Sequence, residues 1–213
     1  MNKNLETIFR ERFIAILRGI APSDVPPVME ALAKGGIRIV EITFDMLDPE
    51  TKAKTAESIR YSIAAGMLTG AGTVLEPGMV DTAVEAGAEF IISPNSDESV
   101  IRRTKELGKL SIPGNFTPAE VVNAYRMGAD IVKLFPVLPE WVNYVKVVHS
   151  PLPHIPLLVT GGVTTENAGK ILQAGASAVA AGASLVSPEL VREKNWKEIT
   201  RRAAAFTAAV KAE

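Results

Sequence analysis

Four times along this chain, a glycine precedes a short run of apolar, often β-branched residues. Such a glycine can end a helix in the left-handed conformation that other residues avoid. The run after it is typical of a parallel strand that is covered on both faces. The repeated pattern therefore predicts helices alternating with the strands of a parallel sheet. The glycines are Gly35 with Gly36, Gly87, Gly128 and Gly175, and the runs after them begin at Ile39, Phe90, Ile131 and Ala178.

Counting all such runs gives about eight expected strands in a chain of 213 residues. That leaves about 27 residues for each strand with its helix, close to the smallest repeat of a (β/α)8 barrel. We therefore expect an α/β fold in which residues 1–213 form a single-domain (β/α)8 TIM barrel, with a short N-terminal helix before the first strand. Pro113 cannot donate a ladder hydrogen bond, so we place it at the C-terminal end of its strand. The expected strands cover residues 13–17, 37–43, 67–71, 90–93, 110–113, 131–135, 157–160 and 178–182.

Helix starts are indicated by capping residues and by prolines in the first turn. The strongest signal is Thr117, followed by Pro118 and Glu120, because these residues predict a capping box. Further starts are expected at Ser23-Asp24, at Pro49 for a helix ending near Ala65, at Pro77, at Thr164 or Thr165, and at about Asn195 for a last helix ending at Lys211.

Composition excludes several classes of function. Lys and Arg number 23 against 24 Asp and Glu, and a formal charge of −1 leaves no basic surplus for binding a nucleic acid. Cysteine is absent, which excludes disulfides and thiolate chemistry, and two histidines supply few metal ligands. No apolar run reaches the roughly 18 residues of a membrane span. Residues 1–12 are charged throughout and lack the apolar core of a signal peptide. We expect a soluble cytoplasmic protein with no nucleic-acid or membrane partner.

Lys133 is the most informative single residue, because it interrupts an apolar segment. Alternation along a strand places it on the same face as Ile131 and Phe135, so apolar groups surround its ammonium. Burial disfavours the charged form of a lysine and supplies a neutral amine that can attack a carbonyl carbon. A buried ion pair, or a lysine reaching solvent at the strand end, would give the same pattern. Lys146 lies in a similar run, but there we expect a helix and a surface lysine.

Glu41 is a second charged residue inside an expected strand. It shares a face with Thr43, and if that face is the barrel interior, Glu41 and Lys133 converge on one polar pocket. A carboxylate beside an amine nucleophile can move protons, and dry surroundings raise its pKa. The two groups could instead neutralise each other. Asp45 continues the same face, so a Mg²⁺ ion held by Glu41 and Asp45 is a weaker alternative without an evident third ligand.

Glycines also follow the last two expected strands, in Thr160-Gly161-Gly162 and in Gly182-Ala183-Ser184. The C-terminal ends of barrel strands carry function, and the loops after the seventh and eighth strands commonly bind phosphate through backbone N–H groups. The sequence therefore predicts a phosphate cradle in these two loops.

Seven segments, in unbroken order between Phe13 and Val186, resemble the KDPG aldolases. These are the 2-keto-3-deoxy-6-phosphogluconate and 4-hydroxy-2-oxoglutarate aldolases, with the phosphogalactonate enzymes as close relatives. The resemblance implies a Schiff-base pyruvate aldolase on a (β/α)8 barrel that forms a homotrimer and needs no metal or cofactor. Its substrate would be a keto acid that is cleaved to pyruvate and either glyceraldehyde 3-phosphate or glyoxylate. The segments are residues 14–20, 35–43, 70–74, 92–95, 113–114, 133–136 and 160–164.

The resemblance also assigns roles to residues. Lys133 would form the iminium with the C2 carbonyl of the substrate, and Glu41 would be the general acid and base. Thr73 and Pro94 match positions that contact the pyruvyl part, and Phe135 packs beside the lysine. The loop residues expected at the distal or phosphate group are Thr160, Gly161, Gly162, Gly182 and Ser184.

Three positions depart from the family pattern. Asp45 stands where many members carry an arginine that holds the substrate carboxylate, so we assign this task to Arg18. Ala183 stands where a serine is expected, with Ser184 one place later, and Trp141 replaces a common glycine. These last differences favour a smaller acid substrate over tight binding of a 6-phosphate.

Other functions also fit the sequence. One is an aldolase for the phosphogalactonate epimer. Another is a sugar-phosphate isomerase or transferase that uses the phosphate loops without an iminium. A third is a barrel that binds a phosphorylated ligand and no longer catalyses.

Overall fold

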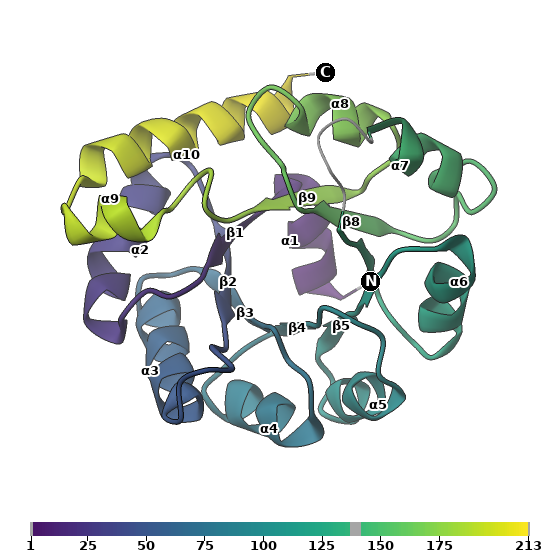
Figure 1. Cartoon of the computed structure of the whole chain (residues 1–213), viewed down its shortest axis with the longest axis horizontal. Helices are drawn as coiled ribbons and strands as arrows, with labels where there is room; N and C mark the ends of the chain where they lie inside the picture. Colours follow the sequence, from purple (N-terminus) through teal and green to yellow (C-terminus); the bar gives the residue numbers. More distant parts are fainter. Residues whose placement is uncertain (1, 137–141, 213) are drawn as a thin grey trace.

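The computed structural model describes residues 2–136 and 142–212, and Figure 1 looks down its central ring of strands. Within those residues, nine strands form one parallel sheet in the order β5-β4-β3-β2-β1-β9-β8-β7-β6. Because β5 and β6 follow each other along the chain, the ring forms the predicted TIM barrel. The strands are β1 (Phe13–Leu17), β2 (Ile39–Thr43), β3 (Leu68–Gly72), β4 (Phe90–Ile92), β5 (Leu110–Ile112), β6 (Gly114–Asn115), β7 (Val132–Leu134), β8 (Leu157–Thr160) and β9 (Ala178–Ala181).

Pro113 divides one expected strand into β5 and β6, rather than ending it as predicted. β5 pairs with β4, and β6 pairs with β7. The ladder cannot run through the proline because its nitrogen carries no hydrogen. Its carbonyl oxygen still accepts a hydrogen bond of 2.9 Å from the Lys133 N–H. The proline therefore lies between β5 and β6, where the ring closes, and beside Lys133 of β7.

Helices form an outer layer around the ring in the described part of the chain, and α1 lies apart from that layer (Figure 1). They are α1 (Lys3–Glu11), η1 (Pro22–Asp24), α2 (Val25–Lys34), α3 (Thr51–Ala64), α4 (Pro77–Glu85), α5 (Glu98–Glu106), α6 (Pro118–Arg126), α7 (Val142–His149), α8 (Ala168–Gln173), α9 (Pro188–Arg192) and α10 (Trp196–Lys211).

Most of the expected helix boundaries are confirmed, including the capping box at Thr117 and the left-handed glycines that precede strands. The start at Ser23-Asp24 is confirmed, because α2 begins at Val25 with Asp24 as its N-cap residue, although the Asp24 side chain makes no capping bond and Pro22–Asp24 form the 3-10 turn η1. One start is wrong. The helix expected from Thr164 or Thr165 begins instead at Ala168, because the residues before it form a hydrogen-bonded loop.

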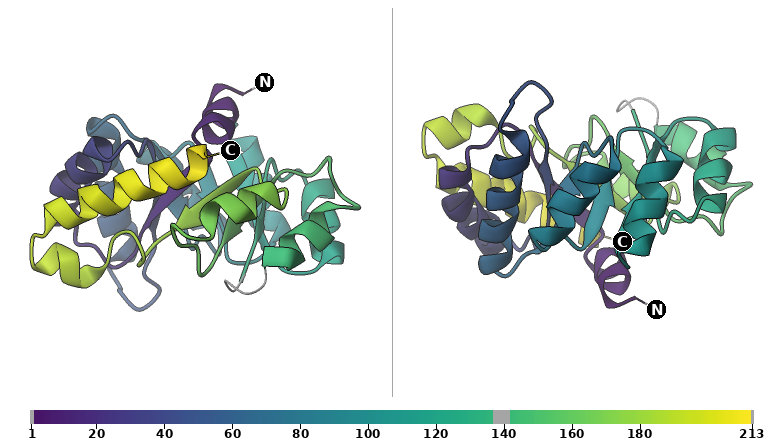
Figure 2. Two further views of the ribbon diagram at one scale, coloured as in Figure 1. Left: turned by 90° about the horizontal axis from the view of Figure 1, so that it is seen from above. Right: turned by 90° about the horizontal axis from the view of Figure 1, so that it is seen from below.

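The barrel interior is apolar over its N-terminal half. The side chains that fill it include Ile14, Ile39, Phe90, Ile131 and Leu158, and Ile8 of α1 belongs to the same buried cluster. Figure 2 shows α1 projecting from one end of the barrel, where it covers this interior. A second, larger core lies between the outside of the sheet and the helix layer. The C-terminal ends of the strands are therefore left for polar side chains.

Candidate active site

A cavity of about 950 Å³ opens at the C-terminal ends of the strands. Its wall brings together every site residue that the sequence predicted, although these residues come from strands and loops far apart in the chain. The predicted residues around it are Arg18, Glu41, Thr73, Pro94, Lys133, Phe135, Thr160, Gly161, Gly162, Gly182 and Ser184.

Lys133 lies in β7 and faces the barrel interior. Its neighbours Val132 and Leu134 belong to the outer core, whereas Ile131 belongs to the inner one, so alternation is as predicted. Only 8% of Lys133 is exposed, and its Nζ lies 4.6 Å from the centre of the Phe135 ring. Burial lowers the pKa of Lys133, the positive charge of Arg18 lowers it further, and Glu41 opposes both. The site therefore favours a neutral amine more than solvent does.

Glu41 of β2 lines the same cavity and is only 3% exposed. Burial raises its pKa, while the charges of Lys133 and Arg18 lower it. In the described residues, its carboxylate makes no hydrogen bond or ion pair with another side chain. Glu41 and Lys133 thus influence each other electrostatically across the cavity without a direct ion pair. An acid and an amine in this arrangement can exchange protons with a molecule placed between them.

Gly72, at the end of β3, is a contributor that the sequence analysis missed. A Cβ atom at this position would collide with the Glu41 carboxylate. The glycine therefore leaves the space in which that carboxylate lies. Its place in the Gly70-Ala71-Gly72-Thr73 segment, on the same inward face as Gly70, was the available signal.

Arg18 and Thr73 meet at the rim of the cavity. The Arg18 Nη2 donates a hydrogen bond of 3.1 Å to the Thr73 hydroxyl oxygen. Thr73 has a φ of 59°, which is unusual for a β-branched residue and costs about 1–3 kcal/mol of backbone strain. This conformation places its hydroxyl beside the one guanidinium that lines the cavity in the described chain. The pair offers donors to an anion such as a carboxylate.

Asp45 and Thr43 lie elsewhere, contrary to the expectation that they share the face of Glu41. Both line a separate hollow of about 260 Å³ beside α3, and the Thr43 hydroxyl donates to the Leu17 carbonyl oxygen at 3.2 Å. The Asp45 carboxylate accepts a hydrogen bond from the Leu47 N–H within its own loop. The Mg²⁺ site at Glu41 and Asp45 is therefore wrong, because the β2–α3 loop turns Asp45 away from the cavity.

The two glycine loops form the other side of the cavity. Gly161 and Gly162 have φ values of 100° and 65°, so the turn after β8 requires glycine at both positions. Within the described chain, the backbone N–H groups of Gly162, Ala183 and Ser184 donate no hydrogen bond. Free N–H groups at the wall of a cavity are suitable donors for an anionic group.

Two side chains behind the loops fix their shape, and of these only Asn167 was missed from the sequence. Asn167 is buried, and its amide donates to the Gly162 carbonyl oxygen at 2.9 Å while its oxygen accepts from the Thr164 N–H at 2.8 Å. The Ser184 hydroxyl donates to the Val163 carbonyl oxygen at 2.9 Å and so joins the two loops. An Asn just before a helix was the only sequence signal for this arrangement.

The other predictions about this region have mixed outcomes. Lys146 is an exposed residue of α7, as expected. Trp141 lies outside the described residues.

Among residues 2–136 and 142–212, no group of three or more His, Cys, Asp and Glu side chains could hold a metal ion. No helix in these ranges is both long and apolar enough to cross a membrane.

Comparison with known proteins identifies the family. The family model for KDPG and KHG aldolases matches residues 5–202. A 2-dehydro-3-deoxy-6-phosphogalactonate aldolase of Escherichia coli (strain K12) is 34% identical over 197 residues, which cover 92% of this chain and 93% of the relative. A 2-dehydro-3-deoxy-phosphogluconate aldolase of Haemophilus influenzae is 29% identical over 181 residues, covering 84% and 82%.

A solved structure is similar in fold as well as in sequence. It is a KDPG aldolase from Legionella pneumophila with pyruvate captured as a covalent carbinolamine intermediate, with a TM-score of 0.82, 25% identity, and coverage of 96% of this chain and 98% of that one. With the family match over most of its length, this chain belongs to the KDPG and KHG aldolase family and is an aldolase, a carbon–carbon lyase.

Proposed function

We propose that this chain is a Schiff-base aldolase that cleaves a 2-keto-4-hydroxy acid into pyruvate and an aldehyde. The observation that carries the proposal is one buried lysine and one buried glutamate that face the same cavity. Burial lowers the pKa of the Lys133 amine and raises the pKa of the Glu41 carboxyl, as a nucleophile and a proton carrier require. The covalent carbinolamine of the Legionella relative supports the same chemistry.

In the proposed reaction, the neutral Lys133 Nζ attacks the C2 carbonyl carbon, and the carbinolamine loses water to give an iminium. Glu41 takes the proton of the C4 hydroxyl, directly or through water. The C3–C4 bond then breaks, its electron pair moves into the iminium to form an enamine, and the aldehyde leaves. Glu41 returns the proton to C3, and water hydrolyses the resulting pyruvyl iminium to release pyruvate and regenerate the amine.

The remaining predicted residues hold the two ends of the substrate. Arg18, with the Thr73 hydroxyl beside it, would hold the C1 carboxylate through charge-assisted hydrogen bonds. Pro94 and Phe135 line the cavity next to the lysine and would pack against the pyruvyl carbons. This arrangement would place the C2 carbonyl between Arg18 and Lys133.

For the distal end, we propose a 6-phosphate rather than a smaller acid. Three free N–H groups are available as donors, those of Gly162, Ala183 and Ser184. A phosphate group can accept hydrogen bonds from all three, whereas a single carboxylate would use fewer. The departures at Ala183 and Trp141, which favoured a small acid, carry less weight because a backbone cradle does not need the missing serine. The sugar could have the gluconate or the galactonate configuration at C4, since the two relatives are named for one each.

Reductive trapping tests the mechanism directly. Protein incubated with pyruvate and borohydride should gain a covalent pyruvyl adduct, and peptide mapping should place it on Lys133. The matched control is Lys146→Ala, which changes an exposed lysine and should trap pyruvate normally. If protein that releases pyruvate from a keto acid forms no adduct, the Schiff-base mechanism is rejected.

Steady-state kinetics with three substrates tests the specificity. We expect kcat/KM to be higher for 2-keto-3-deoxy-6-phosphogluconate or its galactonate epimer than for 4-hydroxy-2-oxoglutarate. A preference for 4-hydroxy-2-oxoglutarate would contradict the phosphate cradle. Thermal stabilisation by these ligands without pyruvate release, measured with lactate dehydrogenase, would favour the non-catalytic barrel.

We also propose that the protein is a homotrimer, as the family resemblance implies. Met46 and Leu47, in the β2–α3 loop, are 53% and 94% exposed. Leu75, three residues after the end of β3, is 38% exposed. These apolar side chains are candidates for burial between copies of the chain. Light scattering should give the mass of three chains for the wild type and a smaller mass for Leu47→Lys. A monomeric wild type would reject the proposal.

A further inference from the structure

The loop between β9 and α9 has no strand or helix to hold its exposed part. Its Gly182 carbonyl oxygen accepts hydrogen bonds from the Leu185 and Val186 N–H groups at 2.8 and 2.9 Å, which makes a tight turn. Ala183 and Ser184, at the tip of that turn, are exposed and line the cavity. The N–H groups of these two residues donate no hydrogen bond within the described chain, so a contact behind the loop can help to fix the direction in which they point.

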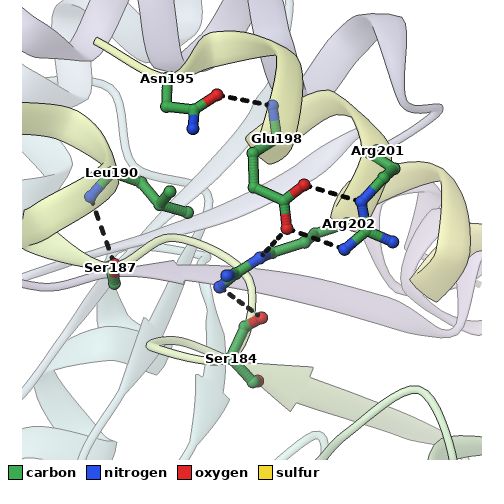
Figure 3. Close-up of polar contacts among 7 residues, drawn as sticks. All are labelled: Ser184, Ser187, Leu190, Asn195, Glu198, Arg201 and Arg202. Atoms are coloured by element: carbon green, nitrogen blue, oxygen red, sulfur yellow. Dashed lines mark hydrogen bonds and ion pairs between the residues drawn. The ribbon is translucent and has the colours of Figure 1, made fainter. Parts of the chain in front are cut away.

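Arg202 of α10 supplies a contact from behind this tip. Its Nη1 donates a hydrogen bond of 3.3 Å to the Ser184 carbonyl oxygen (Figure 3). Arg202 and Ser184 both line a second hollow, of about 370 Å³, on the far side of the loop from the substrate cavity. Ser184 lines both spaces, so the loop is a thin wall with the guanidinium behind it.

Glu198 holds the Arg202 guanidinium in place. Its carboxylate accepts a hydrogen bond of 2.8 Å from the Arg202 Nε and two more from Arg201, at 2.7 and 2.8 Å. The Glu198 N–H is capped by the Asn195 side chain at the start of α10. The hydrogen bonds from Arg201 and Arg202 lower the pKa of Glu198 to about 2, so this carboxylate stays charged at neutral pH.

The contact reaches both glycine loops. The Ser184 hydroxyl is bonded to the Val163 carbonyl oxygen, so a shift of Ser184 also moves the β8–α8 loop. The Ser184 carbonyl shares its peptide plane with the Leu185 N–H, so fixing that carbonyl from behind restrains the backbone on the C-terminal side of Ser184 and, through it, the direction of the Ser184 N–H. Arg202 itself does not line the substrate cavity.

We propose that Arg202, held by Glu198, is a positioning residue that sets the β9–α9 loop for binding the anionic distal group of the substrate. This inference rests on the proposed function and deepens it, because it names a residue outside the cavity that selects between phosphorylated and unphosphorylated substrates. Arg201 shares the same helix and the same carboxylate and lines the same hollow, but in the described residues it makes no hydrogen bond with the loop. Its side chain is 70% exposed, which makes it a matched control.

The test compares Arg202→Ala with Arg201→Ala on a phosphorylated keto acid and on the same acid without its phosphate. Losing one hydrogen bond from a charged group should raise KM for the phosphorylated acid about tenfold. For the unphosphorylated acid, kcat/KM should change less than about twofold, and Arg201→Ala should have little effect on either. Equal loss on both acids, or equal effects of the two variants, would overturn the proposal.

Two further measurements separate this inference from the proposed function. Trapping of pyruvate by borohydride should be unchanged in Arg202→Ala, since pyruvate has no distal group to reach the loop. A wild type that traps no pyruvate would reject the aldolase proposal and leave the role of Arg202 to the phosphate-binding measurement. Binding of inorganic phosphate, followed by calorimetry, needs no catalysis and should weaken in Arg202→Ala but not in Arg201→Ala. Unchanged phosphate binding would overturn the role of Arg202.

A second variant, which keeps the arginine, tests the proposal in case Arg202→Ala does not fold. Glu198→Gln removes the charge that aligns Arg202 but leaves the guanidinium in place, so it should raise KM for the phosphorylated acid by a smaller factor. Thermal unfolding of each variant identifies any that do not fold. A folded Glu198→Gln with normal KM would show that Glu198 does not hold Arg202 for binding.

Discussion

The two ends of the substrate cavity are built in different ways. At the end proposed for pyruvate, Glu41 and Lys133 are strand residues that are 3% and 8% exposed, and the barrel ladder fixes their backbone. At the distal end, Gly162, Ala183 and Ser184 lie in exposed loops whose backbone groups face the cavity. Individual side-chain hydrogen bonds, from Asn167 and Arg202, hold these loops from behind.

This difference separates chemistry from specificity. A reacting amine and its acid must keep a fixed distance for every substrate, and paired strands give that rigidity. A loop held by a few hydrogen bonds can change with one substitution and leave the barrel intact. Substitutions at the pyruvate end should therefore affect all substrates alike, whereas those at the distal end should affect each substrate according to its distal group.

The largest expected effect is that of Lys133→Ala. Without the amine no iminium can form, so kcat should fall by about 10⁴-fold or more, as is typical for loss of a nucleophile. The loss should be the same for phosphorylated and unphosphorylated keto acids, because the lysine does not contact the distal group. Coupled pyruvate-release assays with both acids measure it, with Lys146→Ala as the control. Substantial remaining activity on one acid would break the proposed division of the cavity.

Arg18→Ala comes next. Removing charge-assisted hydrogen bonds to the C1 carboxylate should raise KM by about tenfold to hundredfold. The increase should be equal for all keto acids and should also appear in the pyruvate concentration needed for half-maximal trapping. Arg102→Ala, an exposed arginine of α5, is the control. A normal KM would show that another group holds the carboxylate.

Gly72→Ala and Gly70→Ala, on the same face of β3, separate an effect on catalysis from an effect on stability within one strand. A methyl group at position 72 would displace the Glu41 carboxylate, so kcat should fall by about tenfold to hundredfold through misplacement of the acid. A methyl group at position 70 would instead collide with the buried Phe90 ring and lower the free energy of unfolding by about 1–3 kcal/mol. Denaturant unfolding and kcat are measured on both variants. Gly72→Ala should lose mainly kcat, and Gly70→Ala should lose mainly free energy of unfolding. A stable, fully active Gly72→Ala would contradict the role assigned to this glycine.

The strand-borne half of the site could be predicted from sequence because it follows from periodicity. Alternation along two runs grouped Lys133 with Ile131 and Phe135, and Glu41 with Thr43, without deciding which face is inward. The family resemblance gave both residues a catalytic role, and a parallel barrel brings the ends of all strands to one rim. The same reasoning failed for Thr43, the last residue of β2, and for Asp45 in the loop after it, because both line the hollow beside α3 instead of the cavity.

The loop-borne half could be predicted only as glycines after two strands. Asn167 and Arg202 act through hydrogen bonds to backbone carbonyls, and such contacts leave no periodic signal in a single sequence. The strain at Thr73 and the empty space at Gly72 likewise depend on neighbours from other strands. Contacts between distant segments decide the last three, whereas Asn167 acts within its own loop through specific geometry that local propensity does not encode.

The smallest expected effects are shifts in the pH dependence of pyruvate trapping. Only the neutral Lys133 amine reacts, so the trapping rate should rise as pH rises through the pKa of Lys133, which burial holds below its ordinary value. Arg18→Ala removes a positive charge and therefore favours the ammonium, which raises this pKa and moves the rise to higher pH. Glu41→Gln removes a negative charge, which lowers the pKa of Lys133 and moves the rise to lower pH. Initial rates at saturating pyruvate measure both shifts, with Arg201→Ala as a control that should leave the profile unchanged. Shifts in the same direction would show that the lysine does not sense these two charges across the cavity, and the proposed pyruvate end would lose its electrostatic basis.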